Sequence, residues 1–142
     1  MENNIKKSIE ISASDDKVWN TLTRDEYVRQ WANAFEAGTY VESDFTENAV
    51  VTWKNKEGRN VVKGRVEVSY PGKMLKINYF DNENAPDDAE AGAYKEHYLL
   101  SEHEGRTLFT IESGPLPDQY IEVMDQQWDE AIKLIKKLSE AQ

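Results

Sequence analysis

The sequence predicts an α+β domain in which a curved antiparallel sheet of about seven strands wraps around a long C-terminal helix. The segment from Pro117 to Ala141 carries apolar residues at alternating spacings of three and four, which is typical of an amphipathic helix. The segment from Thr39 to Ser113 alternates apolar and polar residues, as strands with one buried face do. Two short helical patterns follow a first strand near the N-terminus.

The first strand and the first helix are indicated by a change of period. Ile5, Ile9 and Ile11 alternate with polar residues, which predicts a strand with one buried face. Ser14 then offers a side-chain oxygen that can cap a helix, and the acidic pair Asp15-Asp16 suits its first turn. A short helix should therefore begin directly after Ser14.

A second short helix is expected immediately afterwards. Asp25 is predicted to cap it, and the helix should run from Glu26 to Phe35. Gly38 marks its exit because glycine adopts the left-handed conformation that commonly ends helices.

Six further strands are predicted in the middle of the chain, separated by turns that contain glycine, asparagine or proline. Their expected ranges are Thr39 to Ser43, Ala49 to Lys54, Asn60 to Tyr70, Met74 to Phe80, Tyr94 to Glu102 and Arg106 to Ser113. The polar segment from Asp81 to Ala93 is too long for a tight hairpin, so we expect a mobile loop there.

Alternation also assigns side chains to faces of the sheet. In the strand from Asn60 to Tyr70, the residues expected to point inward are Val62, Gly64, Val66, Val68 and Tyr70. The long helix should pack on this inner face, since its stripe needs an apolar partner of similar length. The stripe consists of Ile121, Met124, Trp128, Ala131, Ile135 and Leu138.

Composition limits the possible functions. The chain of 142 residues is the size of one domain, which we place at residues 1–142. Its net charge of −10 disfavours nucleic acid and anionic membrane surfaces as partners. The chain has no cysteine, and the start Met1-Glu2-Asn3-Asn4-Ile5 lacks the apolar run of a signal peptide. No segment is apolar for long enough to insert into a membrane, so a cytoplasmic location is expected.

No catalytic or metal-binding motif is visible. His97 and His103 are the only plausible general bases at neutral pH, and both fit ordinary strand or turn positions. The acidic loop resembles a calcium loop only in composition, because Pro86 and Gly92 stand where such a loop needs glycine and glutamate. The sequence therefore predicts no catalytic residue, no metal and no cofactor, and favours a role other than catalysis.

The aromatic residues are the remaining candidates for a functional site. Individually they are best interpreted as core, but several polar ring tips meeting between sheet and helix would suit a ligand with an apolar or aromatic body. The candidate ligand-binding residues are Trp31, Phe35, Trp53, Val66, Ile77, Tyr79, Tyr98, Phe109, Met124 and Trp128. Glu96 and Glu112 would add polarity if their strands turn that way, and the pattern leaves their faces open.

Several residues carry a resemblance to a known family. Gly64-Arg65-Val66-Glu67-Val68, the segment Tyr70 to Leu75, the hairpin residues Gly105 and Phe109, and Trp128 in the last helix match a recurring framework. With this element order, the chain resembles the helix-grip fold of the START and Bet v 1-like (SRPBCC) superfamily, and within it the activator of Hsp90 ATPase homologue 1-like family. The resemblance implies a cavity between sheet and helix, which other members use for lipids, hormones or polyketide intermediates.

Three functions are open at this point. The leading expectation is a small-molecule binding module that holds an apolar, lipid-like or aromatic ligand. The family resemblance implies an alternative, in which the partner is an Hsp90-like chaperone whose ATPase the protein regulates. The eukaryotic cochaperones carry a separate N-terminal Hsp90-binding domain, for which we expect no room in this chain. The third alternative is a polyketide cyclase or aromatase.

Overall fold

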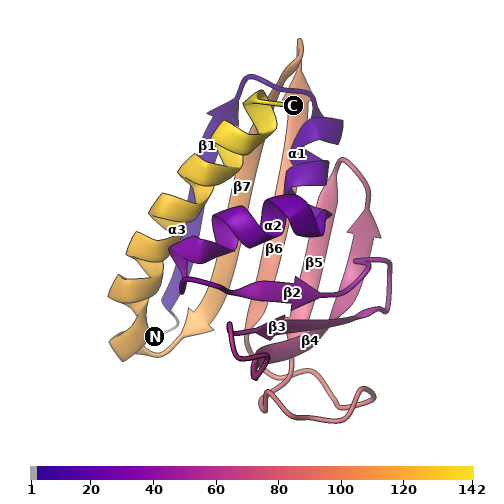
Figure 1. Cartoon of the computed structure of the whole chain (residues 1–142), viewed down its shortest axis with the longest axis vertical. Coiled ribbons are helices and arrows are strands. Elements are labelled where there is room, and N and C mark those ends of the chain that lie inside the picture. Colours follow the sequence, from indigo (N-terminus) through magenta and orange to yellow (C-terminus); the bar gives the residue numbers. More distant parts are fainter. Residues whose placement is uncertain (1–2) are drawn as a thin grey trace.

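The computed structural model describes residues 3–142, which form an antiparallel sheet with helices on one of its faces (Figure 1). The elements in chain order are β1 (Asn3–Ile11), α1 (Asp15–Thr23), α2 (Asp25–Trp31), the 3-10 helix η1 (Ala32–Ala34), β2 (Tyr40–Glu42), β3 (Val50–Lys54), β4 (Asn60–Tyr70), β5 (Met74–Tyr79), β6 (Lys95–His103), β7 (Arg106–Leu116) and α3 (Asp118–Glu140). Met1 and Glu2, which belong to the segment inspected for a signal peptide, lie outside the described residues.

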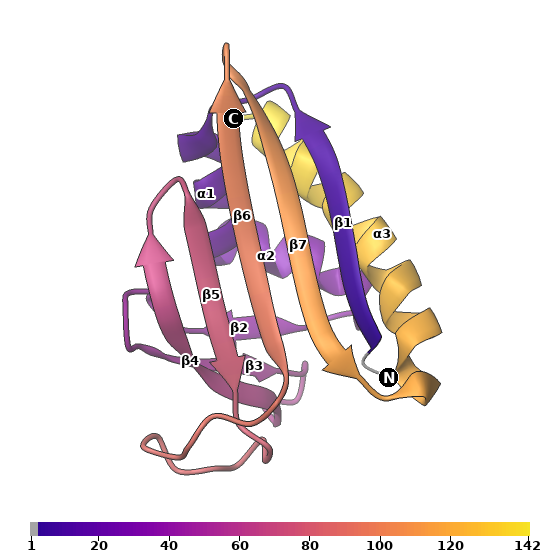
Figure 2. The same ribbon diagram turned by 180° about the vertical axis from the view of Figure 1, so that it is seen from behind.

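The sheet has seven strands in the order β1-β7-β6-β5-β4-β3-β2, and each neighbouring pair is antiparallel. In Figures 1 and 2, β2 and β3 run across the direction of β1 and β7, so the sheet bends strongly along its width. Figure 2 shows that the opposite face carries no helix. The predicted curved sheet around a C-terminal helix, with two short helices after the first strand, is confirmed.

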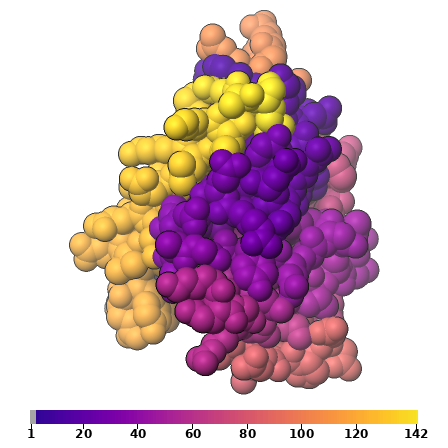
Figure 3. All heavy atoms as spheres, in the orientation of Figure 1, coloured from indigo at the N-terminus to yellow at the C-terminus, as the bar shows by residue number. Residues whose placement is uncertain are grey.

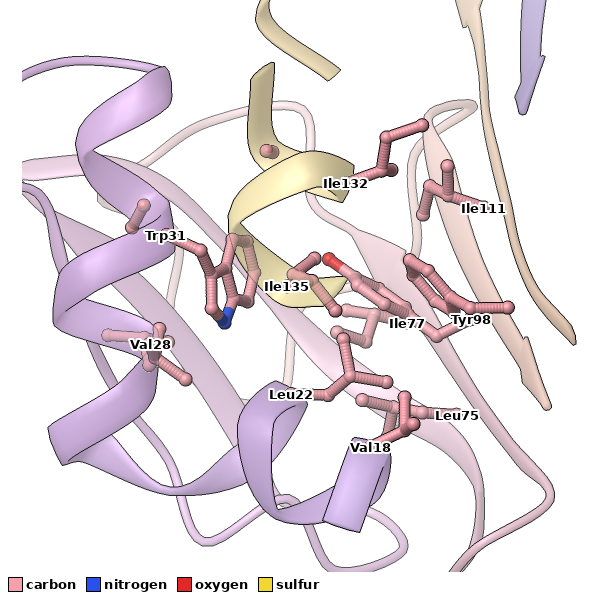
Figure 4. Close-up of a cluster of buried hydrophobic side chains, with 14 of the residues drawn as sticks. Val18, Leu22, Val28, Trp31, Leu75, Ile77, Tyr98, Ile111, Ile132 and Ile135 are labelled. Carbon is pink, nitrogen blue, oxygen red and sulfur yellow. The ribbon is translucent and has the colours of Figure 1, made fainter. Parts of the chain in front are cut away.

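The C-terminal half of α3 supplies much of the core. Of the apolar stripe expected from the sequence, Trp128, Ala131 and Ile135 are buried, together with the neighbouring Ile132, and the other stripe residues are half-buried. Figure 4 shows Ile132 and Ile135 facing side chains of the sheet and of the two short helices. In Figure 3 the yellow end of α3 lies directly against the indigo and purple atoms of α1 and α2.

Polar contacts fix α3 along β1 and α1. Lys7 of β1 lies 3.0 Å from Asp125 and 2.8 Å from Asp129, so one lysine holds two successive turns of the helix. Near the C-terminus, the Ser139 hydroxyl donates to Thr21 Oγ1 at 2.9 Å in a buried position. The helix is therefore tied to one edge of the sheet and to α1, rather than lying evenly across all seven strands.

One predicted capping residue is wrong. Asp25 is the first residue of α2, and Arg24 holds the capping position without a side-chain hydrogen bond. Asp25 instead accepts a hydrogen bond from Arg29 Nε at 2.7 Å. The second helix also ends at Trp31 and continues only as η1, so the predicted helix to Phe35 is too long.

The predicted inner face of β4 is wrong at its C-terminal end. Val66 pairs with Ile77, whereas Val68 pairs with Lys76, so β4 carries one more residue than β5 at this point. Such a bulge reverses the alternation of side chains beyond it. Tyr70 therefore points outward and is 60% exposed, while Gly64 and Val66, before the bulge, are buried as expected.

Gly64 of β4 pairs with Tyr79 of β5, and the lack of a side chain at Gly64 allows the two strands to approach closely there. A Cβ atom at this position would lie 2.4 Å from the Asn78 carbonyl oxygen and 2.9 Å from Cδ1 of Tyr79. Glycine is therefore required here by space, not by its backbone angles.

The loop between β5 and β6 is fastened to β4. Lys63 Nζ donates to the Ala85 carbonyl oxygen at 2.7 Å and lies 2.7 Å from Asp87 Oδ1. Asn60 Nδ2 donates to the Glu83 carbonyl oxygen at 3.0 Å. Asp87, one of the acidic residues of this loop, therefore forms an ion pair with Lys63 of β4.

Truncation of the α3 stripe should destabilise the protein strongly. Ile135 is fully buried, so Ile135→Ala removes apolar contacts and leaves a cavity in the core, which should lower the free energy of unfolding by about 2–5 kcal/mol. Lys133→Ala, on the exposed side of the same helix, is the matched control and should change it by about 0.5 kcal/mol or less. Urea unfolding followed by circular dichroism measures both, and equal losses would contradict the assigned core.

Candidate functional site

A pocket lies between the N-terminal half of α3 and the central strands of the sheet. Its volume is about 560 Å³. The lining residues come from the end of α2, the segment between α2 and β2, the strands β3 to β7 with the residue before β6, and α3. They are Trp31, Phe35, Glu36, Thr39, Trp53, Val61, Val62, Tyr79, Tyr94, Glu96, Tyr98, Leu116, Tyr120, Val123, Met124, Gln127 and Trp128.

Aromatic rings form a continuous wall of this pocket. Trp31 stacks on Trp128 with ring centres 6.3 Å apart, and Trp53 meets Trp31 edge-on at 5.8 Å. Phe35 and Tyr98 both approach Trp128 edge-on, at 4.9 and 6.1 Å. Figure 4 shows Trp31 and Tyr98 on opposite sides of α3's C-terminal half, one from α2 and the other from β6. The wall therefore joins helices and sheet through ring contacts, which are geometrically specific.

A buried carboxylate lies among tyrosine hydroxyls in the pocket wall. Glu96 is only 8% exposed. Its Oε1 accepts from the hydroxyls of Tyr79 at 2.8 Å and Tyr98 at 3.0 Å, and its Oε2 accepts from Tyr94 at 2.7 Å. Trp53 Nε1 in turn donates to the Tyr79 hydroxyl oxygen at 2.9 Å. We call Glu96 and these three tyrosines the Glu96 cluster.

The alternation of β6 explains how the cluster forms. Tyr94, Glu96 and Tyr98 are two residues apart, so their side chains share one face of the extended chain. Burial raises the pKa of the Glu96 carboxyl, and the hydrogen bonds from the tyrosines oppose that rise. Burial and then the charge of Glu96 raise the pKa of Tyr79 well above its usual range, so its hydroxyl keeps its proton at neutral pH.

One further polar atom is buried in the lining. The Nε1 of Trp128 has no hydrogen-bond partner within residues 3–142, and the side chain is only 1% exposed. An indole N–H can only donate, and a buried donor without an acceptor is costly. The pocket therefore combines acceptors at the Glu96 cluster with a donor at Trp128.

The rim of the pocket is apolar and reaches the surface. Val61 of β4 is 51% exposed, and Tyr120 and Val123 of α3 are 53% and 55% exposed. Gln127 Nε2 donates to the Phe35 carbonyl oxygen at 3.0 Å, linking α3 to the chain after η1. Exposed apolar residues around an opening are typical of a binding site.

The structure brings together seven of the ten residues proposed from the sequence. Trp31, Phe35, Trp53, Tyr79, Tyr98, Met124 and Trp128 line the pocket. The remaining three, Val66, Ile77 and Phe109, are fully buried and do not line it. They belong to the hydrophobic core instead.

Sequence reasoning missed several lining residues. Tyr94 and Glu96 are separated from Tyr98 by even numbers of residues, so alternation along the strand puts all three on the same face. This spacing could have assigned Glu96 to the inner face. Glu112 does not line the pocket and instead lies 3.5 Å from His97 Nδ1. Tyr120 and Val123 lie beside the predicted helix stripe, and nothing in their spacing marked them as a rim.

The described residues offer little for metal chemistry. No group of three or more histidine or acidic side chains within residues 3–142 is arranged to hold a metal ion. In that same range no helix is long and apolar enough to cross a membrane. The chemistry that the pocket does offer is hydrogen bonding and proton exchange at Glu96, since a buried carboxyl of raised pKa can do both.

The stability of the protein should respond to the titration of Glu96. A raised pKa means that the folded chain holds this proton more tightly than the unfolded chain. The resulting stabilisation is complete below the ordinary pKa of 4.5 and is lost as pH rises through the raised value. Glu96→Gln cannot titrate, so the stability of the native protein relative to this variant should fall from pH 4 to pH 8.

Chemical unfolding of both proteins at a series of pH values measures that difference. A difference that stays constant, or that grows with pH in favour of the native protein, would contradict the assigned environment of Glu96.

Solved structures share this fold. Protein MLL2253 from Mesorhizobium loti superposes with a TM-score of 0.77 at 14% identity, covering 97% of both chains. The Aha1 protein from Colwellia psychrerythraea, solved as a dimer, gives 0.73 at 16% identity over 96% of both chains. DynU16, a protein in the dynemicin biosynthetic locus, gives 0.73 at 13% identity over 96% of this chain and 47% of its own. These similarities establish the helix-grip-like fold.

Sequence comparison identifies the family. The search of curated proteins found no match. The family model described as "Activator of Hsp90 ATPase homolog 1-like protein" matches residues 12–140, which is most of the chain. This chain therefore belongs to the family of activator of Hsp90 ATPase homolog 1-like proteins.

Proposed function

We propose that this protein is a small-molecule binding module that holds an apolar, lipid-like or aromatic ligand between the sheet and the N-terminal half of α3. The observation that carries the proposal is the pocket of about 560 Å³ with its wall of aromatic rings. Ligand sites in proteins commonly occupy roughly 300–1,000 Å³ and are lined mainly by apolar and aromatic side chains with a few polar groups.

The position of α3 supports access to this pocket. The buried residues of α3 lie between Trp128, near its middle, and Ser139, whereas Tyr120 and Val123 near its start are exposed. The hydrogen bond from Gln127 to the Phe35 carbonyl spans the two sides of the rim. A ligand would enter past these residues without disturbing the packed half of the helix.

The polar atoms of the pocket define what else the ligand carries. Glu96 and the tyrosine oxygens offer acceptor positions, and Trp128 Nε1 offers an unsatisfied donor. A bound molecule that supplied an acceptor to Trp128 would remove the cost of burying a free N–H. The expected ligand therefore has an apolar body and a small number of polar groups, not a fully hydrocarbon structure.

Chaperone regulation is a second candidate, favoured by the family to which the chain belongs. The experiment is to mix the protein with the Hsp90 homologue of its source organism and to measure complex formation and ATP turnover. A change in turnover would support an Hsp90-like partner, and its absence together with a lack of binding would exclude this role.

A cyclase-type activity is supported more weakly. Glu96 is a buried carboxyl of raised pKa that could exchange a proton with a bound molecule, and DynU16, from a biosynthetic locus, has the same fold. Since that similarity is only 13% in sequence, it supports the fold and not the reaction.

Ligand binding can be tested with the four tryptophans of the chain as reporters. Trp31, Trp53 and Trp128 line the pocket, whereas Trp19 of α1 does not. A lipid and aromatic-metabolite library should contain compounds that shift the indole N–H signals of the first three in NMR spectra and leave Trp19 unchanged. A library that shifts none of them, or all four equally, would overturn the proposal.

A substitution that fills the pocket should block the compounds found in this screen. Met124 is half-buried and lines the pocket, so Met124→Trp should weaken binding at least about tenfold by occupying the ligand's volume. Gln126→Trp introduces the same side chain on an exposed position of α3 outside the lining and is the matched control. Isothermal titration measures both affinities, and unchanged binding in Met124→Trp would place the ligand elsewhere.

A further inference from the structure

The charged side chains that line the pocket are both acidic. They are Glu36, exposed at the rim, and Glu96, buried in the wall. The described residues of the lining include no lysine, arginine or histidine. With a net charge of −10 on the whole chain, the field of the protein also favours cations over anions at this opening.

Glu96 is held by neutral groups. Within residues 3–142 no lysine, arginine or histidine forms a salt bridge with it, and its hydrogen bonds come from three tyrosine hydroxyls. The Tyr79 oxygen accepts the N–H of Trp53, and its hydroxyl donates to Glu96. When Glu96 is ionised, the cluster therefore satisfies its hydrogen bonds without neutralising its charge.

Aromatic rings, which can attract cations, line the same pocket as this carboxylate. The faces of aromatic rings carry negative potential, and a cation placed over them in a desolvated site is stabilised, most strongly by tryptophan. Trp31, Trp53, Trp128, Tyr79 and Tyr98 line the same pocket and are buried. Several aromatic rings and one carboxylate without a basic partner thus line one cavity.

We propose that the pocket selects ligands that carry a cationic group, an amine or a quaternary ammonium, on an apolar or aromatic body. This inference rests on the proposed function and specifies its ligand class. The cation lies beside Glu96 and the aromatic wall, where it supplies the missing positive charge. Carboxylates, sulfonates and phosphates, including simple fatty acids, are disfavoured because they would meet Glu96 without a basic residue to pair with.

Three small probes of the same shape test this selection. Benzyltrimethylammonium, neopentylbenzene and phenylmethanesulfonate share a benzyl body and a compact tetrahedral group, with charges of +1, 0 and −1. NMR titration of the indole N–H signals gives their affinities for the native protein. The cation should bind at least about tenfold more tightly than the neutral probe, and the anion most weakly.

Variants separate the charge of Glu96 from its shape. Glu96→Gln should reduce the preference for the cation over the neutral probe to about threefold or less, leaving the contribution of the rings. Glu112→Gln, outside the pocket, is the matched control and should keep the full preference. The comparison among probes in the native protein does not depend on the folding of either variant.

Each result is decisive. Binding of all three probes in the pocket with equal affinity, or tightest binding of the anion, would overturn the cation preference and leave the binding module intact. If a folded Glu96→Gln variant kept the full preference for the cationic over the neutral probe, the proposed role of Glu96 in attracting the cation would be wrong. Failure of the pocket signals to respond to any probe or library compound would overturn the proposed function itself.

Discussion

The structure depends on how α3 divides its length between core and pocket. Its C-terminal half buries Trp128, Ala131, Ile132 and Ile135 and is joined to α1 by the hydroxyl pair of Ser139 and Thr21. The N-terminal half is held at the edge of the sheet by the ion pairs of Lys7. If the whole helix lay in the concave face, side chains would fill the space that the pocket occupies. Attachment at an edge is therefore what keeps the interior open.

Much of this arrangement follows from hydrophobic periodicity. The α3 stripe is regular enough to predict both the helix and its buried side, and the apolar residues that alternate in β5 and β7, such as Leu75, Ile77 and Ile111, are buried. The failures occur where a local feature breaks the period. The bulge after Val66 adds one residue and turns Tyr70 to solvent, and no residue type in the sequence marks its position.

The site was only partly predictable for a different reason. Periodicity separates inner from outer positions, so it grouped Trp53, Tyr79 and Tyr98 correctly with the interior. It cannot distinguish an inner residue that is covered by a helix from one that borders open space. Phe109 and Tyr98 are both inner residues by this criterion, yet only Tyr98 lines the pocket.

The Glu96 cluster shows how a carboxylate is kept inside without a basic partner. Three hydroxyl donors satisfy the two oxygens, which offsets part of the cost of removing the group from water. An internal lysine or arginine would satisfy the same oxygens and also cancel the charge. The use of tyrosines leaves the charge available to whatever occupies the space in front of it.

Gly64 connects this chemistry to the shape of the sheet. The hydrogen atom that replaces a side chain there lets β4 approach the backbone of Asn78 and the ring of Tyr79. The Tyr79 ring carries the hydroxyl that donates to Glu96. A side chain at position 64 would therefore displace this hydrogen-bond donor, although position 64 lies on the neighbouring strand. Backbone spacing between two neighbouring strands thus sets the electrostatic character of the cavity, and homologous chains with a side chain at this point should have a differently organised interior.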